Sequence, residues 1–147
     1  DSTRKNMKKT KARGMRFREG HFFSEKNQKS MHYRSSWEHK VMLLLETSPR
    51  VDSYLVEPFS IPYKIRTTSY NYWPDFLVKF KDGTSLLIEV KPQNQCDMEK
   101  NQAKWEAAVA YCNRHGFIFR VWTEVMISKL RKIARDPNAL TEAIMCH

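Results

Sequence analysis

Apolar and polar residues follow two different periods along the chain, and these periods predict its elements. Helical spacing of apolar residues predicts helices over 36–47, from about 98 to Gly116, and over 124–135. Segments rich in β-branched and aromatic residues predict strands over 72–80, 85–91 and 117–123, with an irregular edge strand over 51–63 and an extended piece over 63–67. This order of helix, three strands, helix, strand and helix is typical of an α/β fold in which helices pack on a mixed sheet.

The strands at 72–80 and 85–91 predict a hairpin whose register follows from their apolar positions. A shift of one residue would move every side chain to the other face. A two-residue turn at Asp82-Gly83 would place Phe76 opposite the charged Glu89. A three-residue loop with Gly83 in the left-handed conformation instead pairs Phe80 with Thr84. One face of the hairpin then becomes apolar, which favours this second register.

The same register gathers charged residues on the opposite face. Asp75 falls opposite Glu89, and Lys91 lies two residues further along that face. Two close carboxylates repel each other unless a cation lies between them. Their oxygens suit Mg²⁺, with Mn²⁺ as a substitute, and a neighbouring lysine can orient a water molecule or offset charge on phosphoryl oxygens. The constellation indicates metal-dependent hydrolysis of a phosphodiester bond.

Composition adds a polyanionic partner to this picture. The chain has 147 residues, 41% of them hydrophobic, and a formal net charge of +10, which fits one basic domain with a substantial core. Residues 1–34 contain 11 basic and 3 acidic residues, or +8, while 35–147 contain 15 and 13, or +2. We therefore predict an N-terminal arm that is extended or disordered until it binds DNA. A solubilising tail or a localisation signal is the alternative.

We accordingly divide the chain into a basic arm at 1–32, partly disordered or in contact with DNA, a nuclease domain at 33–136 and a C-terminal tail at 137–147. Binding should rest on phosphate contacts and weaken steeply with salt. The predicted DNA-binding residues are Lys8, Lys9, Lys11, Arg13, Arg16, Arg18, Arg34 and Lys104. Further phosphate contacts are expected from Lys64, Arg66, Lys79 and Lys81.

The cysteine, histidine and hydropathy patterns do not indicate a disulfide-bonded, zinc-binding or membrane-spanning protein. The chain has three cysteines without a CxxC motif, and its histidines show no zinc-ligand spacing. Its longest apolar run covers only 41–45, so we expect no membrane span. A reducing cytoplasm is the predicted location.

One motif brings a known family into view. Pro74-Asp75, followed after thirteen residues by Glu89-Val90-Lys91, resembles the PD-(D/E)XK nuclease signature. An upstream helix carries Glu38, and a downstream helix contains the segment KWEAA at 104–108. With this context, the span of about 33–130 resembles the N-terminal catalytic domain of the TnsA transposon endonucleases, and also the small head-completion nucleases of tailed phages.

The resemblance implies a restriction-endonuclease-like core and a Mg²⁺-dependent DNA endonuclease. By motif position, Glu38 and Asp75 would hold metal, Glu89 and the Val90 backbone carbonyl would add ligands, and Lys91 would serve catalysis. TnsA proteins usually carry Gln in place of Glu89 and continue into a second domain, so a free-standing phage-type nuclease is favoured. DNA is the implied partner, together with phage head or neck proteins or a transposase subunit. For a phage-type protein, the predicted cytoplasm is that of the bacterial host, with association with the virion as a further option.

Structural roles compete with each of these assignments. Ser35 and Glu38 form a capping-box pattern, which alone could account for Glu38. Asp75 could be a turn residue, and Glu89 with Lys91 could be an exposed ion pair. Two alternative functions also remain, namely a TnsA-like transposase subunit and a non-catalytic DNA-binding protein of virion assembly on the same fold.

Overall fold

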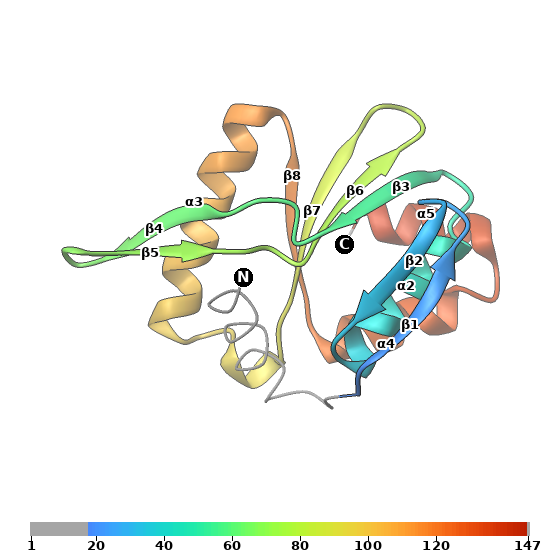
Figure 1. The fold of residues 1–147 in the computed structure, drawn as a ribbon, viewed down its shortest axis with the longest axis horizontal. Helices are drawn as coiled ribbons and strands as arrows, with labels where there is room; N and C mark the ends of the chain where they lie inside the picture. Colours follow the sequence, from blue (N-terminus) through green and yellow to red (C-terminus); the bar gives the residue numbers. More distant parts are fainter. Residues whose placement is uncertain (1–17, 147) are drawn as a thin grey trace.

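A four-stranded mixed sheet forms the centre of the computed structural model, which describes residues 18–146 (Figure 1). Its strands lie in the order β3 (Val51–Val56), β6 (Phe76–Phe80), β7 (Ser85–Val90) and β8 (Ile118–Trp122). The first three are antiparallel neighbours, whereas β8 runs parallel to β7. Helix α3 (Glu99–His115) makes the crossover that a parallel pair requires. The predicted mixed sheet flanked by helices is confirmed.

Helices cover both faces of the sheet (Figure 1). On one face lie α2 (Ser36–Thr47), α4 (Glu124–Ile133) and α5 (Pro137–Cys146), and on the other lies α3, preceded by the short helix η1 (Gln93–Gln95). The Ser35 side chain caps α2, and Gly116 ends α3 in the left-handed conformation with φ 72°. The sequence predicted the first three α-helices with nearly these limits.

The β6–β7 hairpin has the register that its apolar positions predicted. Phe76 pairs with Ile88, and the Phe80 N–H donates to the Thr84 carbonyl at 2.9 Å. Gly83 has φ 92°, a conformation that a side chain would disfavour. Because the register is fixed by both the turn and the apolar stripe, the two faces of the hairpin differ in character.

Each face of the sheet is buried in its own apolar core. The core toward α2, α4 and α5 includes alternate residues of β6 and β7, together with the fully buried Val41, Leu45, Trp122 and Leu130. The core toward α3 is smaller and includes Leu77, Leu87, Ala108 and Cys112. The charged end of the hairpin belongs to the face that α3 covers.

Strands β1 (Gly20–Ser24) and β2 (Lys29–Tyr33) pair as a separate antiparallel ribbon. Met31 is buried in the core beside α2, and the Tyr33 ring stacks on His39 with centroids 4.0 Å apart. The structure therefore differs from the predicted arm at residues 20–32, which we expected to be extended or disordered. The two strands are short and contain few apolar residues, so their alternation of apolar and polar positions could not be recognised in the sequence. Residues 1–17 lie outside the described part of the chain.

A second ribbon, formed by β4 (Ile61–Ile65) and β5 (Thr68–Tyr72), extends across α3 and beyond it (Figure 1). We had predicted one strand over 72–80. Instead Trp73 and Pro74 separate β5 from β6, because proline lacks the N–H that would continue the ladder. This break places Asp75 at the junction of the ribbon and the central sheet.

The C-terminal segment at 137–147 was predicted to be a tail, but residues 137–146 form α5. Pro137 begins this helix rather than merely ending the previous one, since proline is well suited to the first helical position. Leu140 and Ile144 are fully buried in the same core as Met31. Both the first ribbon and α5 thus belong to the core of the domain that we had limited to 33–136.

Candidate active site

Asp75 and Glu89 meet on the α3-facing side of the sheet. Asp75 directly precedes β6, so it continues the pairing of Phe76 with Ile88 toward Glu89. Both carboxylates are buried, with 2% of Asp75 and none of Glu89 exposed. The Asp75 Oδ2 atom accepts a hydrogen bond from the Val90 backbone N–H at 2.6 Å. This bond holds the Asp75 carboxylate against the strand that carries Glu89.

Two buried lysines belong to the same region. Lys91 follows β7 and is only 4% exposed, and its backbone N–H donates to the Trp122 carbonyl at 3.0 Å. Lys104 comes from α3, is 8% exposed and places its Nζ atom 5.6 Å from the centroid of the Tyr72 ring. We predicted Lys104 as a DNA-binding residue on sequence alone. The structure places it beneath the surface, close to the carboxylates.

Tyr72, at the end of β5, contributes a hydroxyl group to this region. Burial raises the pKa of Tyr72 well above its ordinary value, and the negative charges of Glu89 and Asp75 raise it further. The hydroxyl therefore keeps its proton and can donate it to a carboxylate. Sequence analysis missed Tyr72 because we assigned it to the same strand as Asp75, whereas it ends a separate ribbon.

Glu38 lies in the first turn of α2. Its backbone N–H donates to Ser35 Oγ at 3.1 Å, and its Oε1 accepts from the Arg34 backbone N–H at 3.0 Å. The carboxylate thus helps to order the start of α2, as the capping-box alternative expects. Among residues 18–146, no three acidic, histidine or cysteine side chains are grouped to hold a metal. A metal-binding role for Glu38 stays a prediction.

The predicted DNA-binding residues other than Lys104 fall into three groups. Lys8, Lys9, Lys11, Arg13 and Arg16 lie outside the described residues. Arg18 is exposed. The Arg34 guanidinium forms an ion pair with Glu57 at 3.2 Å and is 19% exposed, and the Glu57 N–H donates to the Asp75 carbonyl at 2.8 Å. Arg34 therefore helps to hold the segment beside Asp75, and its contact with DNA stays a prediction.

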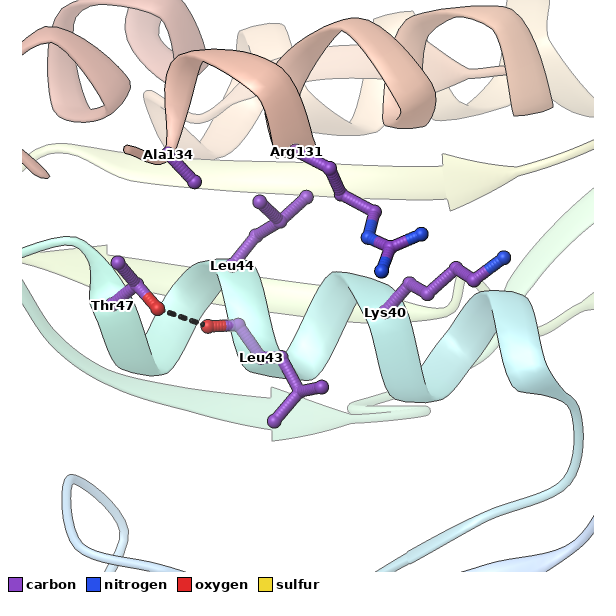
Figure 2. Close-up of a pocket in the computed structure, with 6 residues that line it drawn as sticks. All are labelled: Lys40, Leu43, Leu44, Thr47, Arg131 and Ala134. Atoms are coloured by element: carbon purple, nitrogen blue, oxygen red, sulfur yellow. Dashed lines mark hydrogen bonds between the residues drawn. The ribbon is translucent and has the colours of Figure 1, made fainter. Parts of the chain in front are cut away.

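A small pocket on the opposite side of the sheet is not part of this site. It lies between α2 and α4 and is lined by Lys40, Leu43, Leu44, Thr47, Arg131 and Ala134 (Figure 2). Its two cationic side chains extend toward the same end of the groove (Figure 2). The pocket contains no carboxylate, so it offers no ligand that would bind a divalent cation.

The carboxylate pair has the chemistry of a divalent metal site. Two buried anionic groups on neighbouring strands are costly unless cations offset their charge. Lys91 and Lys104 supply positive charge nearby, and the backbone of Val90 runs between Glu89 and Lys91. Carboxylate and carbonyl oxygens are the ligands that Mg²⁺ and Mn²⁺ prefer. The residues present therefore fit such an ion.

Fold and site together define a restriction-endonuclease-like protein with the PD-(D/E)XK arrangement. Residues 48–124 match the family described as TnsA-like endonuclease N terminal, and the chain belongs to this family. It is also similar to the head completion nuclease of Enterobacteria phage T4, with 25% identity over 120 residues that cover 65% of this chain and 80% of the phage protein. The TnsA-like endonuclease family predicted from the motif is confirmed.

Between residues 18 and 146, no helix combines the length and hydrophobicity needed to span a membrane.

Proposed function

We propose that the chain is a Mg²⁺-dependent endonuclease that hydrolyses phosphodiester bonds in DNA. The observation that carries this proposal is the burial of Asp75 and Glu89 side by side, with Lys91 next along the same strand. A structural hairpin would have apolar residues at such positions, because a buried charge destabilises a fold unless it is compensated. Buried ionisable groups that lie close to one another are typical of catalytic sites.

The residues take distinct roles in this proposal. Asp75, Glu89 and the Val90 carbonyl would hold the ion, whose positive charge would polarise the scissile phosphate when bound. Lys91 would orient the attacking water and offset the charge that develops on the phosphoryl oxygens. The buried Tyr72 hydroxyl would donate a hydrogen bond to Glu89 and so fix the direction of that carboxylate. Glu38 would act from the start of α2.

A phage-type role is favoured over a transposase role by two observations. The match to the phage nuclease covers 80% of that protein, so a chain of this size corresponds to most of a protein named a nuclease. Position 89 is Glu, whereas TnsA proteins usually carry Gln there. The family match nevertheless supports a second candidate, a TnsA-like endonuclease subunit that requires a transposase partner.

Nicking of supercoiled plasmid in Mg²⁺ tests the proposal. The parent chain should convert plasmid to open-circular or linear DNA, and Asp75→Asn and Lys91→Ala should each lower the rate by at least about 100-fold. Asp52→Asn and Lys129→Ala are matched controls, because they make the same changes at exposed positions of β3 and α4. Both controls should cleave at the parent rate.

Equal rates for the parent, Asp75→Asn and Lys91→Ala would contradict the proposed mechanism and favour a non-catalytic DNA-binding role. Activity that arises only when a transposase partner is added would favour the TnsA-like subunit instead. If EDTA did not change the rate of cleavage, the proposed requirement for a metal ion would be wrong.

A further inference from the structure

The β4–β5 ribbon has two faces of opposite character. Ile61, Tyr63 and Tyr72 are buried against α3. Opposite residues of an antiparallel pair share a face, so the outer face carries Pro62 with Asn71 and Lys64 with Ser69. All four outer residues are exposed. The ribbon is thus anchored by an apolar inner face and presents a polar, basic outer face.

The charge of this segment has one sign. Residues 58–74 contain Lys64 and Arg66 but no Asp or Glu, although the chain as a whole has 16 acidic residues. Arg66 lies 3.9 Å from Glu99 at the start of α3, and both side chains are largely exposed, at 80% and 69%. Such a surface pair is weak and exchanges readily for a phosphate contact. The ribbon therefore complements a polyanion.

The turn at the tip is strained at its arginine. Ile65 pairs with Thr68, which leaves a two-residue connection of Arg66 and Thr67. Such turns favour Gly, Asn or Asp at positions of positive φ, yet Arg66 has φ 57°. A non-glycine residue there destabilises the fold. An arginine at this position is best explained by what its side chain contacts.

The base of the ribbon leads directly into the candidate site. Tyr72 ends β5, and only Trp73 and Pro74 separate it from Asp75. A polyanion that lies along the ribbon therefore reaches the carboxylates at its base. The ribbon also extends past α3, away from the rest of the domain (Figure 1).

We infer that the outer face of the β4–β5 ribbon is a contact surface for duplex DNA, with Lys64, Ser69 and Asn71 toward the groove and Arg66 on a phosphate. A two-stranded ribbon fits the major groove, and lysine and asparagine are among the side chains that contact base edges there. This inference rests on the proposed function, since it names the form of DNA that the same site receives.

Arg66→Gly separates this role from a structural one, because the two roles predict opposite effects. Glycine relieves the strained φ, so the melting temperature should rise by about 2–4 °C. Loss of one phosphate contact should weaken duplex binding about five- to tenfold near 0.1 M salt and lower the slope of log K against log salt by about 1. Lys64→Ala should weaken binding without raising the melting temperature.

The first ribbon provides a matched control. Gln28, in the turn between β1 and β2, has φ 56°, so Gln28→Gly relieves the same kind of strain. It should raise the melting temperature by a similar amount and leave DNA affinity unchanged. All variants would be made in the full chain with Asp75→Asn, and binding measured by fluorescence anisotropy on a labelled duplex and on the single strand, in Mg²⁺ and across a salt series.

Weaker duplex binding by Arg66→Gly, with Gln28→Gly unchanged, supports the inference. Parent-like affinity and salt slope for Arg66→Gly overturn it, and they leave the proposed function intact if the chain with the native Asp75 cleaves plasmid. Tighter binding of the single strand than of the duplex also overturns it. Absence of any salt-dependent DNA binding in the Asp75→Asn chain overturns both the inference and the proposed function.

Discussion

The two faces of the β6–β7 hairpin are built from the same two strands but serve different ends. The face toward α2 carries Phe76, Val78, Leu86 and Ile88, all at most 1% exposed. The face toward α3 begins with the apolar pair Leu77 and Leu87 and then changes to charged residues at the sheet end. The first face stabilises the fold through burial of apolar area. The second face contains buried charges, which do not by themselves stabilise the fold.

This contrast indicates how one small sheet combines a core with a site. Alternation of side chains lets a strand keep every second residue in the core while its other residues meet a different environment. Helix α3 and the β4–β5 ribbon supply that second environment through Lys104 and Tyr72. Substitutions on the two faces should therefore separate activity from stability, and the following predictions are ordered by the size of the effect.

Glu89→Gln should have the largest effect, and on activity alone. The substitution keeps the shape of the side chain but removes its charge, so cleavage should fall by about 100- to 10,000-fold. Stability should change little, because the substitution relieves the repulsion from Asp75 while it weakens the attraction to the neighbouring lysines. Plasmid-nicking rates and thermal melting of the same preparation measure both quantities. Parent-like cleavage by Glu89→Gln would show that this face is not catalytic.

Leu86→Ala should give the opposite result on the other face. Leu86 is 1% exposed within the larger core, so truncation should lower the free energy of unfolding by about 2–5 kcal/mol. Leu55→Ala is the control, because Leu55 is 43% exposed on β3 and should change stability by less than about 0.5 kcal/mol. Urea unfolding measures both values. If the two variants were equally stable, the assignment of the core face would be wrong.

Two substitutions at the start of α2 should separate capping from catalysis. Ser35→Ala removes the bond to the Glu38 N–H and should lower stability by about 1 kcal/mol without changing cleavage. Glu38→Gln keeps an oxygen acceptor for the Arg34 N–H and should leave stability nearly unchanged. If Glu38 takes part in catalysis, the rate of DNA cleavage by Glu38→Gln should still fall by at least about tenfold. Parent-like cleavage by Glu38→Gln would assign Glu38 to the cap alone.

The reactivity of the Cys112 thiol should show the smallest effect, and it measures how tightly α3 covers the sheet. Burial raises the pKa of the Cys112 thiol to about 11, so only about one thousandth is thiolate at pH 8. Cys146 is exposed and should react with a thiol reagent first. Cys112 should be labelled only on unfolding, which mass spectrometry of timed samples would show. Rapid labelling of Cys112 in the folded chain would mean that α3 opens readily.

Some features of the site follow from local pattern and could be predicted from sequence. The register of the hairpin follows from the apolar period and from Gly83, so the pairing that brings Asp75 toward Glu89 needed no structure. The limits of α2 and α3 follow from Ser35 and Gly116 for the same reason. Each of these signals lies within a few residues of the feature it determines.

Other features depend on partners that are distant in sequence. The first ribbon and α5 contribute few apolar residues each, and Met31, Leu140 and Ile144 become core residues only when they meet the same helices. Tyr72 resembled an ordinary strand residue, and Lys104 an ordinary basic residue of a helix. Only the packing of the ribbon and α3 on the sheet brings them beside the carboxylates.

The sequence by itself thus determined the class of fold, the hairpin register and the two opposing acids, because period and turn chemistry act over short separations. The tertiary structure alone decided that these acids are buried and which cationic and hydroxyl groups surround them. Those outcomes depend on which faces meet when separate elements pack, and a linear pattern does not encode that choice locally.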